Sequence, residues 1–169
     1  MLHGGGVGGG RKGSVVQPGA PDLMVPDRLV DAGVFRYEDE PQMIIRVYEN
    51  TYPPTRELTK IVVDAMGDLT GKRVVDAGCG TGVLSVAAAL KGASRVLAVD
   101  SKGDCLSCAR DNALANGVDN VVAPGLSDLF RQVGGKHNLF VFTPSPYPGY
   151  DKASKTPQYQ PVETVRRFF

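Results

Sequence analysis

The stretch VVDAGCGTG, residues 74–82, decides the fold, because three glycines fall within five residues directly after an apolar run. A glycine-rich turn lets a buried strand bend tightly into a helix and lets a ligand approach the backbone where a side chain would block it. The sequence therefore predicts a strand over residues 73–77 and a helix over residues 83–90, with loop amide groups exposed at the helix N-terminus.

The same alternation continues along the chain. Apolar runs at 96–99, 120–123 and 139–142 predict further strands, and residues 102–116 predict a helix. Each strand is a continuous apolar run, which is typical of strands buried on both faces. We expect an α/β fold, a Rossmann-like doubly wound parallel sheet with flanking helices.

Residues upstream of the first glycine turn carry two weaker patterns. Residues 42–50, QMIIRVYEN, favour a strand or edge element. Residues 52–69 favour an amphipathic helix of about four turns. Its apolar face is expected to comprise Leu58, Ile61, Val62, Ala65 and Met66.

Composition sets the domain organisation. The 169 residues, of which 42% are apolar, can bury one core of ordinary size. Glycine and proline crowd residues 1–26, which predicts a disordered tail, so the domain is expected over 27–169 with its core at 47–148. A net charge of +1 argues against a strongly cationic nucleic-acid binder. Three cysteines, no signal peptide and no membrane-spanning run predict a cytoplasmic protein.

A second stretch, VLAVD at residues 96–100, suggests the ligand. Asp100 ends the second predicted strand about 20 residues after the loop, where a carboxylate can accept hydrogen bonds from two ribose hydroxyls. Loop and carboxylate together predict an adenosine-containing ligand. The alternative is purely architectural: the glycines only permit close packing, and Asp100 caps the helix that begins near Lys102.

The glycine spacing separates two kinds of ligand. Dinucleotide-binding turns read G-x-G-x-x-G, whereas here Asp76 precedes Gly78, Gly80 and Gly82 in the order D-x-G-x-G-x-G. An acidic residue is unfavourable beside a pyrophosphate but suits the ammonium of a methionine moiety and a nearby sulfonium. The segment resembles motif I of class I S-adenosylmethionine-dependent methyltransferases, and VLAVD resembles their ribose-binding segment.

The resemblance extends over residues 47–148. VYENTYPPTRELT at 47–59 resembles the entry segment of HemK-type glutamine and adenine amino-methyltransferases, and residues 89–100 and 109–118 also look like the ribosomal protein L11 methyltransferases. The resemblance implies that Tyr52, Pro54 and Thr55 lie over the methionine end of the cofactor. It also implies that Asp128 binds the adenine amino group and that Leu129 lies beside the ring. The full set of implied S-adenosylmethionine-binding residues is Tyr52, Thr55, Asp76, Gly78, Cys79, Gly80, Gly82, Asp100, Ser101, Asp128 and Leu129.

A third stretch, TPSPYP at residues 143–148, is the candidate catalytic segment. Enzymes of this group that methylate a planar amino nitrogen carry N/D/S-P-P-Y/F here, which implies catalytic roles for Thr143, Ser145, Pro146 and Tyr147. The match is not clean in either register. The resemblance implies methyl transfer to an amino or amide nitrogen of a protein or nucleic acid, and a small-molecule acceptor stays open.

Two other classes of function remain as alternatives. Only 22 residues follow Tyr147, so the last strands of the family's sheet are expected to be missing. An open sheet edge follows unless a partner chain or second copy covers it, the upstream segment compensates, or the sequence is a fragment of a longer product. The chain would then be a non-catalytic or truncated methyltransferase-like subunit. An NAD-dependent oxidoreductase is the second alternative. Cys105 and Cys108 favour packing within a helix, and no metal site is predicted.

Overall fold

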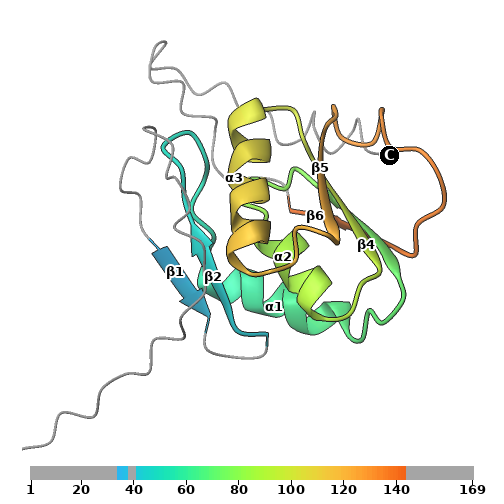
Figure 1. Cartoon of the computed structure of the whole chain (residues 1–169), viewed down its shortest axis with the longest axis horizontal. Coiled ribbons are helices and arrows are strands. Elements are labelled where there is room, and N and C mark those ends of the chain that lie inside the picture. Colours follow the sequence, from blue (N-terminus) through green and yellow to red (C-terminus); the bar gives the residue numbers. More distant parts are fainter. Residues whose placement is uncertain (1–33, 38–40, 144–169) are drawn as a thin grey trace, which may run out of the picture.

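The structure is a computed structural model that describes residues 34–37 and 41–143. A hairpin comes first, followed by strands that alternate with helices (Figure 1). The elements are, in chain order, β1 (Val34–Tyr37), β2 (Met43–Arg46), α1 (Arg56–Met66), β3 (Arg73–Ala77), α2 (Val83–Leu90), β4 (Arg95–Asp100), α3 (Gly103–Ala115), β5 (Val122–Leu126) and β6 (Leu139–Phe142).

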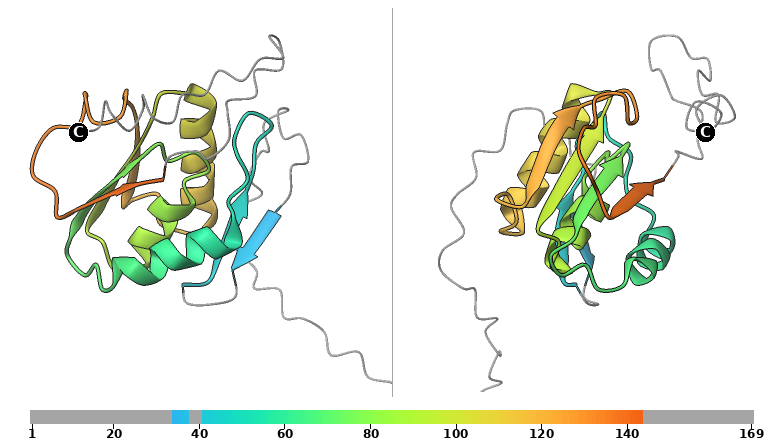
Figure 2. Two further views of the ribbon diagram at one scale, coloured as in Figure 1. Left: turned by 180° about the vertical axis from the view of Figure 1, so that it is seen from behind. Right: turned by 90° about the vertical axis from the view of Figure 1, so that its right-hand side faces the viewer.

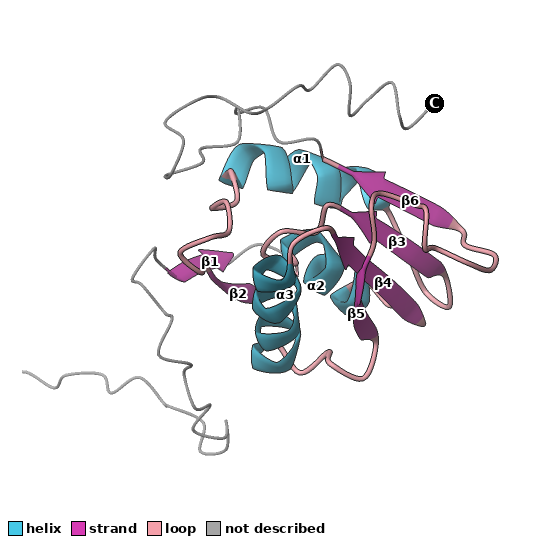
Figure 3. Ribbon diagram, turned by 90° about the horizontal axis from the view of Figure 1, so that it is seen from above, coloured by secondary structure: helices cyan, strands magenta, loops and turns pink. Residues whose placement is uncertain are grey.

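A four-stranded parallel sheet forms the centre of the fold. Its strand order is β5-β4-β3-β6, with Val75 opposite Leu97 on one side and opposite Phe140 on the other (Figure 3). Sequence order reverses beside β3, which is the point where ligands bind in open parallel sheets. The predicted Rossmann-like α/β fold is confirmed.

The helices and the hairpin form two further layers over one face of the sheet (Figures 1 and 2). α2 is the centre of this core, because seven of its eight residues are buried. Small side chains on α2 let the sheet, α1 and α3 approach closely, and the hairpin packs on the far side of α2 and α3. The predicted strand in residues 42–50 is confirmed as β2, which pairs antiparallel with β1.

A smaller core lies on the opposite face of the sheet. Val75, Ala77 and Val99 are buried there, and side chains from residues 130–142 pack against them. Phe140 is on this face as well, in edge-to-face contact with Phe130, but it is 51% exposed.

Two details of the predicted sheet were wrong. β5 begins at Val122 and continues to Leu126, whereas the sequence predicted residues 120–123. Proline and glycine, here Pro124 and Gly125, usually weaken or end a strand. An edge strand tolerates proline, and β5 is at an edge of the described sheet. Burial on both faces is found for the inner strands β3 and β4, but Leu126 and Phe140 on the outer strands are exposed.

The apolar face predicted for α1 was only partly right. The helix has 11 residues, about three turns, and its buried side chains are Thr59, Val63 and Met66. Of the five residues expected on its apolar face, Met66 is buried and Val62 is partly buried, whereas Leu58, Ile61 and Ala65 are exposed. The face that packs on the neighbouring α2 is thus displaced from the most apolar stripe. Within the described residues, no helix has the length and apolar character needed to cross a membrane.

Candidate functional site

The glycine loop joins β3 to α2 at the carboxyl edge of the sheet, and its glycines have different roles. Gly82 is in the left-handed region at φ 75°, and a Cβ there would be 2.8 Å from Ala109 on α3. Its lack of a side chain therefore lets α2 begin against α3. A Cβ on Gly80 would meet nothing within 4 Å, and one on Gly78 would meet only Phe142 at 3.9 Å. These two positions leave room for a ligand.

The amide groups of this loop are already used inside the protein. The N–H groups of Gly78 and Cys79 both donate to the Val99 carbonyl oxygen, at 2.8 and 3.0 Å. The Gly80 N–H donates to Oδ2 of Asp100 at 3.0 Å. The expectation that the loop exposes its amides was therefore wrong for these three groups, because the end of β4 accepts their hydrogen bonds. A pyrophosphate would need such amides as donors.

Asp100 connects the loop to the start of α3. Besides the Gly80 amide, its carboxylate accepts a hydrogen bond from the Lys102 N–H at 3.0 Å, through Oδ1. The architectural alternative assigned Asp100 the role of N-cap residue of this helix. In the structure α3 begins at Gly103 and its N-cap residue is Lys102, so Asp100 lies two residues before the cap position. The Cys105 thiol also hydrogen-bonds to this carboxylate. A carboxylate has about four acceptor sites and this group is partly exposed, so it retains acceptor capacity toward solvent. Ser101 is exposed beside it.

Asp76 and Cys79 lie beneath the open side of the loop. Asp76 is 1% exposed, and its carboxylate accepts a hydrogen bond from Ser85 Oγ on α2 at 2.6 Å. Burial raises the pKa of Asp76 to about 6, because desolvation disfavours the charged form. Burial also raises the pKa of the Cys79 thiol, as do the neighbouring Asp76 and Asp100 carboxylates. A thiol that stays protonated is a packing group and a poor nucleophile.

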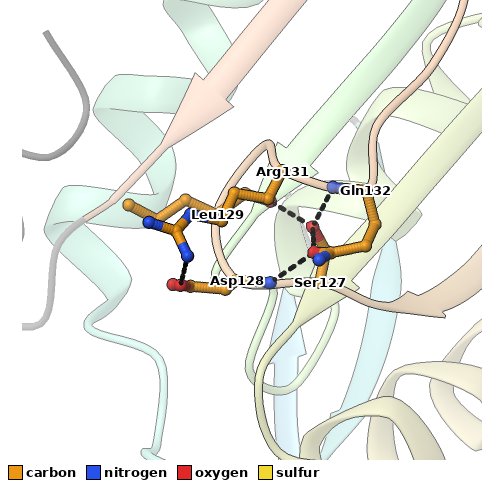
Figure 4. A network of polar contacts seen from close by, with 5 residues as sticks. All are labelled: Ser127, Asp128, Leu129, Arg131 and Gln132. Atoms are coloured by element: carbon orange, nitrogen blue, oxygen red, sulfur yellow. Dashed lines mark hydrogen bonds and ion pairs between the residues drawn. The ribbon is translucent and has the colours of Figure 1, made fainter.

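The turn after β5 brings further predicted residues to the same edge. The Ser127 N–H donates to the Asp100 carbonyl oxygen at 3.0 Å, which holds the turn beside the end of β4. Asp128 is partly exposed and forms an ion pair with Arg131 at 3.6 Å (Figure 4). Leu129 adopts φ 53°.

The remaining predicted site residues flank this edge or lie beyond the description. Thr143 directly follows β6, and the pairing of Ala77 with Phe142 puts it level with Gly78. Ser145, Pro146 and Tyr147 lie outside the described residues. Tyr52 is exposed, and Thr55 is the exposed N-cap residue of α1, without a capping hydrogen bond from its side chain. Direct cofactor contacts of these residues stay predictions.

One organising residue was missed by the sequence reasoning. Asn112 on α3 is fully buried, and its side-chain amide donates to the carbonyl oxygens of Arg46 and Thr81, both at 2.8 Å. Its Oδ1 accepts from the Arg46 N–H at 2.8 Å. Asn112 thus joins β2 to the glycine loop. The available signal was the polar residue inside ARDNALANGV, residues 109–118.

Sheet order, glycine loop and carboxylate together define a class of protein, the class I methyltransferase type of Rossmann-like fold. A family model described as "Ribosomal protein L11 methyltransferase (PrmA)" matches residues 52–137, about half of the chain. The chain therefore belongs to this family, as the resemblance predicted.

Individual relatives agree with this assignment. A protein from Methanocaldococcus jannaschii designated a protein N5-glutamine methyltransferase is 32% identical over 103 residues, which cover 61% of this chain and 50% of the relative. A ribosomal protein L11 methyltransferase of Thermotoga neapolitana is 45% identical over 71 residues, or 42% of this chain and 26% of the relative. The chain thus spans half or less of the length of these curated relatives.

Solved structures match at the level of the fold. The ribosomal protein L11 methylase of Lactobacillus delbrueckii superposes with a TM-score of 0.52 and 27% identity, covering 64% of this chain and 56% of that one. A precorrin 8w decarboxylase from Methanobacterium thermoautotrophicum gives a TM-score of 0.55 at 17% identity, covering 73% and 62% of the two chains, and shows the fold alone.

Proposed function

We propose that this chain binds S-adenosylmethionine and transfers its methyl group to an amino or amide nitrogen of a protein substrate. Membership of the L11 methyltransferase family supports the reaction, and the relatives named for ribosomal protein L11 and for protein glutamine support a protein acceptor. A nucleic-acid or small-molecule acceptor is the competing outcome of the assay described below.

The observation that carries the proposal is the bond between Gly80 and Asp100. It fixes a partly exposed carboxylate directly beside the loop whose Gly78 and Gly80 leave open space. This arrangement fits a nucleoside whose ribose hydroxyls donate to Asp100 and whose remaining length runs over the loop. Asp128, on the neighbouring strand end, is proposed to accept a hydrogen bond from the adenine amino group, with Leu129 beside the ring.

The loop fits this cofactor better than a dinucleotide. Because the Gly78, Cys79 and Gly80 amides are bonded to β4, they are not offered to a pyrophosphate. Asp76 adds negative charge under the loop, since a pKa of about 6 leaves it mostly ionised at pH 7. That potential favours a sulfonium and an ammonium, even though Asp76 itself is buried away from direct contact.

When bound, the cofactor supplies a methyl group on a positively charged sulfur. The protein then has to hold the acceptor nitrogen in line with that methyl group and exclude water. Thr143, level with Gly78 at the end of β6, is proposed to orient the acceptor through its hydroxyl, together with residues 145–147. No general base is needed when the nitrogen loses its proton after transfer.

A second candidate function is a methyltransferase-like subunit that binds the cofactor without catalysis. It is favoured by the exposed Phe140 on β6, one of the two edge strands of the described sheet. In this case a partner chain or a second copy is proposed to cover that edge. We also propose a cytoplasmic location, supported by three cysteines that are all free.

Calorimetric titration tests the cofactor site. The chain is titrated with S-adenosylmethionine, S-adenosylhomocysteine and NAD, alongside Asp100→Ala and, as a matched control, Asp119→Ala on the exposed turn after α3. Asp100→Ala removes the two proposed hydrogen bonds from the ribose hydroxyls, each worth about 1.5 kcal/mol. We therefore expect roughly 100-fold weaker binding in Asp100→Ala and unchanged binding in Asp119→Ala. Preference for NAD, or unchanged affinity in folded Asp100→Ala, would overturn the proposed site.

Transfer of label from methyl-labelled S-adenosylmethionine then tests catalysis. Protein, RNA and small-molecule fractions are offered separately as acceptors. Label in the protein fraction supports the proposed reaction. Label found only in RNA or only in small molecules would show that the acceptor is not a protein. Cofactor binding with no labelled acceptor in any fraction supports the non-catalytic subunit.

A further inference from the structure

The turn after β5 is held by the side chain of one residue that the proposed function does not use, Gln132. Its Oε1 accepts a hydrogen bond from the Asp128 N–H at 2.9 Å and lies 2.9 Å from Ser127 Oγ (Figure 4). The Gln132 N–H points back to the same Ser127 oxygen at 3.3 Å. The Gln132 side chain thereby holds the turn closed. It contacts Ser127 and Asp128, the two residues that precede Leu129.

Leu129 shows that this turn is constrained. Among the described residues, it is the only non-glycine residue with positive φ. A leucine enters the left-handed region only when its surroundings impose it, and such outliers concentrate at ligand sites. Ser127 Oγ donates to the Leu129 carbonyl oxygen at 2.6 Å, so Gln132, which also contacts that hydroxyl, acts on Leu129 through Ser127.

The Asp128 carboxylate projects from the backbone that Gln132 holds. Its ion pair with Arg131 is solvent-exposed at 3.6 Å, and exposed pairs of this kind hold a side chain weakly. The bond from the Asp128 amide to Gln132 is shorter and is made by the backbone itself. Losing that bond would free the peptide that aims the carboxylate, while leaving Asp128 present.

We propose that Gln132 is a positioning residue that aims Asp128 and so makes the site prefer adenine to hypoxanthine, an inference that rests on the proposed cofactor function. The base carries an amino donor in adenine and a carbonyl acceptor in hypoxanthine at the same position. An ionised carboxylate only accepts hydrogen bonds, so an Asp128 aimed at the exocyclic group binds the amino group of adenine and is repelled by the carbonyl oxygen of hypoxanthine. A carboxylate that has lost this aim can instead accept from the N1–H of hypoxanthine, and the preference shrinks.

The test compares S-adenosylhomocysteine with S-inosylhomocysteine, which differ at that position of the base and at the adjacent N1, where hypoxanthine carries a hydrogen. Gln132→Met keeps the length of the side chain and removes the strong acceptor. Gln132→Glu keeps an oxygen that accepts from the Asp128 amide, and is the conservative rescue. Asp128→Asn gives the preference expected when the carboxylate itself is missing. Hydrogen exchange of the Asp128 amide in the ligand-free chain reports the bond directly.

We expect the unmodified chain to bind S-adenosylhomocysteine about tenfold or more tightly than the inosine analogue. Gln132→Met should reduce the ratio to about twofold, as Asp128→Asn does, and speed exchange of the Asp128 amide, whereas Gln132→Glu should retain the ratio within about twofold. A tenfold preference that survives in Gln132→Met would overturn the inference and leave the cofactor site intact. Equal binding of both analogues by the unmodified chain would also overturn the inference and leave the cofactor site intact. Binding of neither analogue would overturn both the inference and the proposed function.

Discussion

Replacing Gly82 by alanine tests the close contact between the glycine loop and α3. The new methyl group would lie 2.8 Å from both Cα and Cβ of Ala109, and the residue would keep a φ of 75°. The left-handed conformation costs an alanine about 1 kcal/mol, and forcing a methyl group into a packed contact costs about 1–3 kcal/mol more. We expect Gly82→Ala to lower the free energy of unfolding by about 3 kcal/mol.

Gly80→Ala is the matched control in the same loop. Its φ of 52° imposes a similar conformational cost, but an added Cβ meets nothing within 4 Å. We therefore expect a loss of about 1 kcal/mol, partly offset because alanine reduces the entropy of the unfolded chain. Unfolding in urea, followed by circular dichroism at constant m-value, gives both numbers.

A third variant identifies the contact that is responsible. Ala109→Gly removes one of the two Ala109 atoms that the new methyl group would meet, and glycine within a helix costs about 1 kcal/mol by itself. In the Gly82→Ala background this cost should shrink or reverse, because the two sites are coupled. Equal losses for Gly82→Ala and Gly80→Ala, or simple additivity with Ala109→Gly, would refute the close-approach argument.

Two further predictions concern buried polar groups. Because burial raises the pKa of Asp76 to about 6 from 3.8, this carboxyl contributes stability that is fully present below about pH 4 and lost as the pH rises through 6. Asp76→Asn should remove a pH-dependent term of about 3 kcal/mol, and a stability difference from the unmodified chain that stays constant from pH 4 to pH 8 would contradict the assignment. Asn112→Ala leaves the Arg46 N–H and two carbonyl groups without their partner and should cost about 3 kcal/mol or more in urea unfolding. Asn116→Ala, at a more exposed position with similar bonds to Ile44, should cost about 1 kcal/mol, and equal losses would count against the role of burial.

The central part of this fold could be predicted from the sequence because each signal there is local. The apolar run at 73–77 and the small residues at 83–90 specify β3 and α2 through their own composition, and the structure has the same bounds. β5 was misjudged because proline and glycine weaken a strand in isolation, whereas its position at a sheet edge is a tertiary property.

In the site, too, some features could be predicted from local sequence, and others depend on how the strands pair. The spacing from the glycine loop to Asp100 predicted that they would meet, since neighbouring parallel strands end at one edge, and the Gly80–Asp100 bond confirms the meeting. The occupied loop amides and the burial of Asp76 were not predictable, because both depend on which way each group faces after β3 and β4 pair. Asn112 was missed for a related reason: an asparagine in a helix gives no sign of the backbone that it will meet 66 residues earlier.

Two asparagines of α3 hold the strand β2 at a fixed position along the helix. Residues four apart on a helix are about 6 Å apart along its axis, close to the roughly 6.7 Å between alternate residues of a strand. Asn112 and Asn116 therefore bond to the N–H and C=O of Arg46 and Ile44 in turn, as a neighbouring strand would. A slip of β2 by one residue would turn those backbone groups away and break all four bonds, so α3 fixes the position of β2 along the helix.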